Sequence, residues 1–388
     1  MKRLLRVSFD IFISSLTPII LWFLIGIVFD KNLTNVFTIT YPFQCLPGII
    51  TSIFGVGANV CKYKDKNKNA DDNGIFYGTI ITIILFGFLA FNSGNYINFM
   101  NMDKDIYLIF TRYSIIQIML QVIMQLILTK LYYLEDNKKA NLITILFNTL
   151  NLVVLTLTSL ITKNQLLATT LTLICLSIFD IVIFILNVKK IDYKLNIKNC
   201  FKYDAASCSI SILFFIMYLF GFSNSFSYGT KYVTAITFAT LVTDIQWDIT
   251  GAIKTVVKID VVKKQFNYKE HFKNVSILDT ILISSVILLS FILYPFYKPD
   301  LSIVSIFIAL HLLDYATMVT TKIKMCYLEI ERSAVKTTTN VIIAYVMRTF
   351  ISFLPTPFCT IIGQISASAY EFIYANLTYN KFIKANKK

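Results

Sequence analysis

Apolar residues recur along this chain in long runs, and short polar or basic segments separate the runs. Most runs are about 20 residues long, which is the length that an α-helix needs to cross the ~30 Å hydrocarbon core of a membrane. We expect each run to form a membrane-spanning helix, and no stretch remains for a separate soluble domain. The twelve runs cover approximately residues 7–29, 35–61, 75–92, 106–131, 140–161, 165–188, 205–222, 228–257, 275–297, 301–321, 337–356 and 358–378. The pattern predicts an all-α, polytopic membrane protein.

The polar segment 189–204 divides these twelve helices into two sets of six. Because six is even, both sets start on the same side of the membrane. This predicts two six-helix bundles related by a parallel pseudo-twofold axis along the membrane normal. We therefore expect an N-terminal bundle at 1–188, a cytoplasmic linker at 189–204 and a C-terminal bundle at 205–388. Two bundles of this kind enclose a cleft suited to alternating access.

Composition and charge support this class and set the orientation. Hydrophobic residues make up 56% of the chain and charged residues 15%, whereas soluble domains contain about 25% charged residues. If the N-terminus is cytoplasmic, 29 of the 36 Lys and Arg residues fall in cytoplasmic segments. The positive-inside rule then predicts a multi-pass protein of the cell membrane with both termini in the cytoplasm. The net charge of +14 is thus explained by topology, and a basic face of this kind also suits anionic lipid rather than nucleic acid.

The second predicted helix contains Pro42, Pro47 and Gly48, and it ends in Gly55-Val56-Gly57 before a basic segment. Each proline removes a backbone hydrogen-bond donor, so we expect this helix to bend and to act as a hinge. The pattern resembles the multidrug and toxic compound extrusion (MATE) family. That family lies within the wider multidrug/oligosaccharidyl-lipid/polysaccharide exporter superfamily.

The resemblance extends to the tenth predicted helix, which contains His311 and Asp314. Bacterial MATE proteins carry an aspartate in this helix, so the resemblance implies that Asp314 is a ligand of the coupling ion. The chain departs from the family in its seventh helix, where many relatives have a glutamate and this chain has no acid. Instead, Asp244 and Asp248 lie four residues apart in the eighth helix and share one helix face.

Charged side chains inside the predicted helices are rare and unevenly distributed. A charge near the bilayer centre costs roughly 3 kcal/mol or more, so such residues usually pair with one another or line a pathway. The candidates for a coupling-ion and substrate site all lie in the second half of the chain: Asp244, Asp248, His311, Asp314, Arg348 and Glu371. In the alternative, purely structural interpretation, Arg348 neutralises Glu371 or an aspartate, and His311 bonds to a backbone group.

The nature of the coupling ion stays open at this point. A Na⁺ ion needs several oxygen ligands, which Asp314 and Asp248 could supply together with threonine hydroxyls. A proton site needs a buried carboxylate with a second acid or a histidine nearby. In the first half of the chain, Gln117, Gln121 and Asp180 are candidates for polar side chains that line the cleft.

These observations favour an ion-coupled (Na⁺ or H⁺) antiporter that exports small organic compounds, cationic or amphipathic, by alternating access. Acidic groups in the cleft would attract cations. The alternative is a flippase for a lipid-linked or polysaccharide precursor on the same fold. Such proteins typically line the cavity with several basic residues, whereas here only Arg112 and Arg348 lie at that depth.

An enzyme is not expected, because the sequence contains neither a His-Glu-x-x-His nor a Gly-x-Ser-x-Gly motif. The seven cysteines form no Cys-x-x-Cys pair, which argues against a metal centre or a disulfide framework. We expect a monomer that contacts a small organic substrate and membrane lipid, with no cofactor besides the coupling cation.

Overall fold

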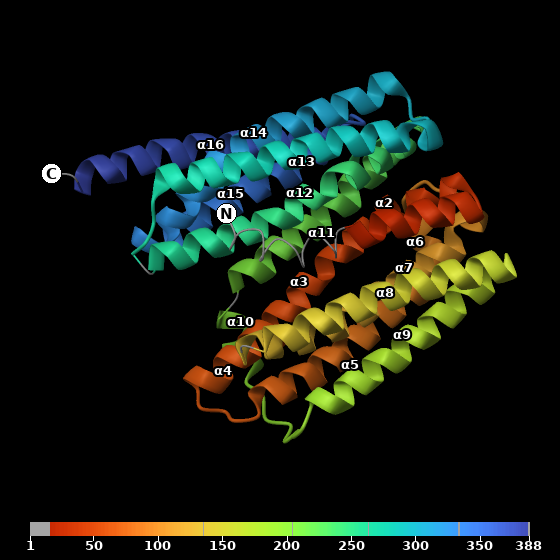
Figure 1. The fold of residues 1–388 in the computed structure, drawn as a ribbon, viewed down its shortest axis with the longest axis horizontal. Helices are drawn as coiled ribbons and strands as arrows, with labels where there is room; N and C mark the ends of the chain where they lie inside the picture. Colours follow the sequence, from red (N-terminus) through yellow and green to blue (C-terminus); the bar gives the residue numbers. More distant parts are fainter. Residues whose placement is uncertain (1–15, 135, 204, 263, 333, 387–388) are drawn as a thin grey trace. The chain divides into compact units, whose positions relative to one another are not determined.

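A computed structural model of the chain describes residues 16–386 except positions 135, 204, 263 and 333. The side chains of 202–207 and 245–252, and a few others, lie outside the description. Every regular element among the described residues is a helix, and no strand occurs among them (Figure 1). The all-α prediction is confirmed.

A helical segment falls within each of the twelve predicted runs. Eight helical stretches of the described chain are long and apolar enough to cross a membrane. The helices are Leu16–Val28, η1 (Lys31–Asn35), α2 (Val36–Thr40), η2 (Tyr41–Cys45), α3 (Leu46–Ile50), η3 (Thr51–Gly57), α4 (Ala58–Lys64), α5 (Ala70–Phe91), α6 (Ser93–Phe99), α7 (Lys104–Tyr133), α8 (Asn137–Thr162), α9 (Gln165–Asn187), α10 (Ile197–Tyr203), α11 (Ala205–Phe226), α12 (Thr230–Val262), α13 (Tyr268–Tyr297), α14 (Leu301–Glu331), α15 (Ala334–Ile351) and α16 (Cys359–Asn386).

The chain packs as two compact units. One consists of Ile20–Leu219, and we call it the N-terminal unit. The other, the C-terminal unit, runs from Phe220 through α16 and includes the described residues before Ile20. The first unit ends within α11, so the predicted linker at 189–204 lies inside the N-terminal unit, where it forms an extended segment followed by α10.

The second predicted helix is broken into pieces with different hydrogen-bonding patterns, as Pro42 and Pro47 led us to expect. It passes from α2 into the 3₁₀-helix η2, then into α3, the π-helix η3 and α4. Pro42 lies in the first turn of η2 and Pro47 in the first turn of α3. Each proline lacks the N–H that would bond back into the preceding segment, and each follows a point where one type of helix gives way to another. The irregular shape is therefore confirmed, and the hinge role stays a prediction.

Glycines let this broken helix approach its neighbours closely. A Cβ atom added at Gly48 would lie 2.3 Å from the hydroxyl oxygen of Ser211 on α11. A Cβ atom added at Gly57 would lie 2.3 Å from the backbone carbonyl oxygen of Cys200 on α10. A larger residue at Gly57 would force the two helices apart, because the atoms it meets are backbone, whereas at Gly48 the side chain of Ser211 would first have to rotate.

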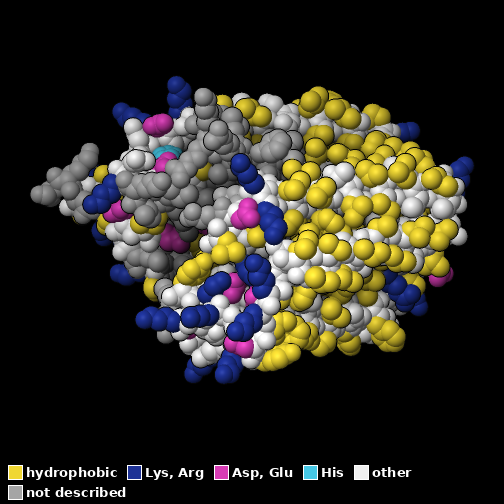
Figure 2. Space-filling model, turned by 60° about the horizontal axis from the view of Figure 1, so that its bottom comes forward, with side chains coloured by type: hydrophobic (Ala, Val, Ile, Leu, Met, Phe, Trp, Pro, Cys, Tyr) yellow, Lys and Arg dark blue, Asp and Glu magenta, His cyan; other side chains and the backbone are white. Residues whose placement is uncertain are grey.

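The surface of the N-terminal unit matches a helical bundle that faces lipid. Hydrophobic side chains cover the surface over α5, α8 and α9, and Lys and Arg gather toward the end where α4 and α5 meet (Figure 2). Exposed isoleucine, leucine and phenylalanine side chains of this kind would be costly in water, whereas hydrocarbon accommodates them.

Charged side chains are buried at that end of the N-terminal unit. Lys130 of α7 is 7% exposed and forms a salt bridge with Asp72 at the start of α5. The Lys130 ammonium also donates to the backbone carbonyl of Asn187 at 2.8 Å. Lys62 of α4 lies 2.6 Å from the neighbouring carboxylate of Asp71. These lysines therefore hold helices together, in addition to contributing to the basic face that the sequence predicts.

The first turn of α5 also anchors the extended segment after α9. The carboxylate of Asp72 accepts hydrogen bonds from the backbone N–H groups of Lys189 and Lys190 at 3.3 and 3.1 Å. The side-chain carbonyl of Asn73 accepts from the backbone N–H of Asp192 at 3.1 Å, and its amide donates to the Asp192 carboxylate. Asp72 and Asn73 thus fix where the chain leaves α9.

The substitution Asp72→Asn should destabilise the protein. It removes one charge of a buried pair and leaves the Lys130 ammonium short of a counter-charge, at a cost of about 3 kcal/mol. Asp71 remains 3.6 Å from Lys130, which keeps the cost at the low end of the usual range. Thermal unfolding of the detergent-solubilised protein measures the effect, with the exposed Lys68→Gln as control. Equal melting temperatures for Asp72→Asn and the control would show that the network does not stabilise the fold.

The carboxylate of Asp192 should make the stability of the fold depend on pH. Hydrogen bonds from the amides of Asn73 and Asn69 lower the pKa of Asp192 from 3.8 to about 2. A carboxylate with a lowered folded-state pKa stabilises the fold above its unfolded pKa and loses this contribution as pH falls through the folded pKa. The difference in melting temperature between the wild type and Asp192→Asn should therefore shrink between about pH 4 and about pH 2. A difference that is constant over this range would rule out the contribution.

Candidate functional site

The candidate site in the C-terminal unit is built on three helices that pack against one another, α14, α15 and α16. Asp314 lies near the middle of α14 and is 3% exposed. Arg348 of α15 and Glu371 of α16 are also buried, and His311 is half-buried one turn before Asp314. The structure therefore places four of the predicted residues in the interior of one unit.

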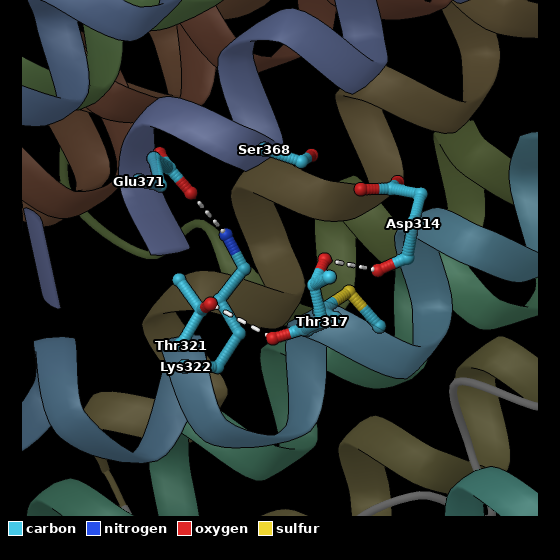
Figure 3. Close-up of a pocket in the computed structure, with 7 residues that line it drawn as sticks. Asp314, Thr317, Thr321, Lys322, Ser368 and Glu371 are labelled. Atoms are coloured by element: carbon cyan, nitrogen blue, oxygen red, sulfur yellow. Dashed lines mark hydrogen bonds and ion pairs between the residues drawn. The ribbon is translucent and has the colours of Figure 1, made fainter. Parts of the chain in front are cut away.

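A small pocket opens beside Asp314 (Figure 3). Its cavity volume of about 10 Å³ is close to the space that one water molecule occupies. The pocket is lined by Asp314, Thr317, Met318, Thr321, Lys322, Ser368 and Glu371. Asp314 and Glu371 thus share one pocket, and the hydroxyl of Ser368 points toward the Asp314 carboxylate (Figure 3).

The side chain of Gln364 connects the predicted residues. Its amide nitrogen donates to the carboxylate of Asp314 at 2.8 Å and lies 3.1 Å from Nδ1 of His311. Its carbonyl oxygen accepts a hydrogen bond from Arg348 at 3.2 Å. Because the guanidinium can only donate, Arg348 fixes the orientation of the amide, and Nδ1 of His311 must be the acceptor of the remaining bond.

The salt bridge of Glu371 is to Lys322, with 3.0 Å between the ammonium nitrogen and the carboxylate oxygen. The structural interpretation of the sequence paired Arg348 with Glu371 or an aspartate, whereas the structure pairs Glu371 with Lys322 and joins Arg348 to the amide of Gln364. Lys322 lies one residue past the apolar run 301–321, so the sequence pattern places it outside the tenth predicted helix. In the structure α14 continues to Glu331, and Lys322 and Lys324 are both buried.

The structure does not place the two acids of the eighth predicted helix, Asp244 and Asp248, among the described residues that line this pocket. Asp244 is half-buried on α12, which packs against α14, and it is not among the residues lining the pocket. The side chain of Asp248 lies outside the described residues. A contact between the two helices comes from Tyr315, whose hydroxyl donates to the backbone carbonyl of Thr243 at 2.8 Å. Na⁺ binding by Asp314 and Asp248 together stays a prediction.

The candidates in the N-terminal unit lie on two helices, α7 and α9. Gln117 and Gln121 are half-buried on α7, and Arg112 is exposed, where it donates to the Ser93 hydroxyl at 3.0 Å. Asp180 of α9 is 3% exposed, and among the described residues its carboxylate oxygens have no hydrogen-bond partner. A buried carboxylate without donors favours the neutral form, because ionisation in an apolar interior is costly.

Three residues of the site were missed by sequence reasoning: Lys322, Gln364 and Ser368. A signal for two of them exists, because Gln364, Ser368 and Glu371 follow the i, i+4, i+7 spacing of one helix face. Lys322 is eight residues after Asp314, which also places it near the same face of α14. Among the described residues, no group of three His, Cys, Asp or Glu side chains is arranged to hold a metal ion.

Comparisons with known proteins place the fold. No protein-family model matches the chain, and no curated protein matches its sequence. Among solved structures, an inward-facing multidrug resistance MATE family transporter of the MOP superfamily is similar, with 14% identity and a TM-score of 0.65. That match covers 99% of this chain and 96% of the other.

Two further structures extend this likeness. An outward-facing multidrug resistance MATE transporter has 15% identity and a TM-score of 0.62, over 99% of this chain and 96% of the other. A MOP superfamily transporter from Pyrococcus furiosus Vc1 has 14% identity and a TM-score of 0.64, over 98% of this chain and 96% of the other. Its binding pocket is described as having reversed polarity, which suggests a different function for that protein. The present chain therefore has the fold of the MATE family transporters of the MOP superfamily.

Proposed function

We propose that this protein is an ion-coupled antiporter of the cell membrane, with both termini in the cytoplasm, and that it exports small cationic or amphipathic organic compounds. Na⁺ or H⁺ moves in the opposite direction and is bound at Asp314. The observation that carries the proposal is the buried carboxylate of Asp314, which adjoins a pocket of one-water size and is contacted by the neutral amide of Gln364. The fold, shared with transporters named for multidrug resistance, supports the same reading.

Asp314 is suited to coupling because its charge is only partly compensated. Among the described residues it forms no salt bridge within 4.0 Å, unlike Glu371 in the same pocket. A cation bound to Asp314 would cancel the charge of the carboxylate. It would therefore lower the free energy of conformations in which that side chain is buried. Ion and substrate binding are then linked, since each shifts the transporter by its differential affinity for the two states.

The flippase alternative predicts a surface of basic side chains that could hold phosphate groups. Among the described residues of the C-terminal unit, the buried cations have protein partners instead: Lys322 bonds to Glu371, Lys324 to Asn376 at 2.6 Å, and Arg348 to Gln364. This arrangement favours the exporter. Transport of a lipid-linked precursor, without transport of an organic cation, would favour the flippase.

The substitution Asp314→Asn keeps the size of the side chain and removes its charge, so it should uncouple transport from the ion gradient. We expect gradient-driven flux of the fluorescent cation ethidium in proteoliposomes to fall by about 5- to 150-fold, the range of typical coupling free energies. Fluxes are measured with an imposed H⁺ gradient, an imposed Na⁺ gradient, and neither. The exposed substitution Asp105→Asn serves as the matched control.

If Asp314→Asn transports ethidium with the ion dependence of the wild type, Asp314 is not the coupling group. Asp180, the buried carboxylate of the N-terminal unit, then becomes the next candidate. If neither variant nor wild type moves ethidium in response to any gradient, the exporter proposal itself fails for this class of substrate.

A further inference from the structure

A lysine ammonium lines the pocket in which the coupling ion would bind. Lys322 lies two turns after Asp314 on α14, and lysine side chains on a helix lean back toward its N-terminus. Its ammonium group reaches Glu371 at 3.0 Å and lines the same pocket as Asp314 (Figure 3). The pocket, which has room for about one water molecule, is therefore lined by a positive charge that belongs to the protein itself.

The side-chain oxygen atoms lining the pocket are those of the Asp314 and Glu371 carboxylates and of three hydroxyl groups, Thr317, Thr321 and Ser368. Two of these hydroxyls already donate to backbone carbonyls of α14, that of Thr317 to Asp314 and that of Thr321 to Thr317, both at 2.8 Å. Hard cations are held by several oxygen ligands, so each oxygen already occupied by a hydrogen-bond donor weakens such a site. Lys322 occupies an oxygen of Glu371, and the amide N–H of Gln364 occupies an oxygen of Asp314. The carbonyl oxygen of Gln364 could serve as a ligand, but its hydrogen bond from Arg348 turns it away from Asp314.

A proton has none of these requirements. It needs one lone pair, which the second carboxylate oxygen of Asp314 provides, and it needs no coordination shell. H⁺ and Na⁺ carry the same charge, so either would cancel the charge of Asp314. What separates the two ions is the space and the free oxygen ligands that Na⁺ needs and H⁺ does not.

We propose that Lys322, together with the amide of Gln364 held by Arg348, makes the Asp314 site selective for H⁺ over Na⁺. Lys322 is thus a specificity-determining residue that occupies the place of a metal ion in the pocket. This inference rests on the proposed function, because it names the ion that the Asp314 site would couple to transport.

Charged groups on the helices that pack against α14 also affect whether Asp314 is ionised or protonated. The cation on α15 is Arg348, which favours the ionised form of Asp314. The acids are Asp244 on α12, Asp279 on α13 and Glu371 on α16, and these favour the protonated form. His311 on α14 itself accepts from Gln364 and is therefore neutral in this arrangement.

Na⁺ binding can be tested without knowing the substrate. Thermal unfolding of the full-length protein in detergent is compared in NaCl and in N-methyl-D-glucamine chloride at equal ionic strength and mildly alkaline pH. A cation that binds the folded state raises Tm in proportion to the logarithm of its concentration. We expect no Na⁺-specific rise in Tm for the wild type, and a Na⁺-specific rise that grows with concentration for Lys322→Met. The rise should disappear again in Lys322→Met combined with Asp314→Asn.

Two control variants separate the charge of Lys322 from the loss of a buried lysine. Lys322→Arg keeps the cation and should show no response to Na⁺. Lys324→Met removes a buried lysine from the same helix, one that bonds to Asn376 rather than to an acid, and should also show none. If Lys322→Met does not yield folded protein, Lys322→Gln keeps a donor for Glu371 and should show the same Na⁺-specific rise.

Two outcomes overturn the inference. A Na⁺-specific rise in the wild type that Asp314→Asn removes would make Na⁺ the coupling ion, while leaving Asp314 as the coupling group. Absence of any Na⁺ response in both Lys322→Met and Lys322→Gln would show that Lys322 does not set the selectivity. Neither outcome depends on the ethidium flux, so the failure of this inference and the failure of the proposed function remain distinguishable.

Discussion

A charged side chain inside a bundle of membrane-spanning helices must find its partner within the protein, because the surrounding hydrocarbon offers neither water nor counter-ions. In the N-terminal unit, Lys130 meets this requirement with Asp72 and the carbonyl of Asn187. In the C-terminal unit, Lys322 meets it with Glu371. Asp314 is held by a neutral amide instead, and this difference leaves its charge available to be cancelled by an incoming ion.

The bonds around Asp314 also suggest how a change in its charge would reach other helices. Gln364 of α16 is hydrogen-bonded to Asp314 of α14 and to Arg348 of α15, so one amide links three helices. When Asp314 is neutral, its carboxyl group becomes a weaker acceptor for the amide N–H, and the charge-assisted character of that bond is lost. The packing of α14, α15 and α16 then depends on whether the site is occupied, which is the property that a coupled transporter requires.

Most of the helices could be predicted from the sequence, because an apolar run of about 20 residues indicates a helix that crosses lipid. The broken second helix follows from Pro42 and Pro47. The inner end of α14 could not be predicted in this way, because Lys322 and Lys324 are buried by protein rather than by lipid and hydropathy cannot tell the two apart. Asp314 stood out through its charge and the family resemblance. Gln364 did not, because a neutral polar residue in a helix is common, and its role appears only when its three hydrogen-bonded neighbours are known.

In the mechanism proposed above, Asp314 takes up and releases a proton inside the C-terminal unit. Infrared difference spectroscopy on the protein in lipid, recorded between an acidic and an alkaline buffer, tests this directly, because a protonated carboxyl group in an apolar site has its own carbonyl stretching band. We expect the acid-minus-alkaline spectrum of the wild type to contain such a band. Asp314→Asn should lack this band, while Asp105→Asn should retain it. Difference spectra of Asp314→Asn that match the wild type in this region would contradict the claim.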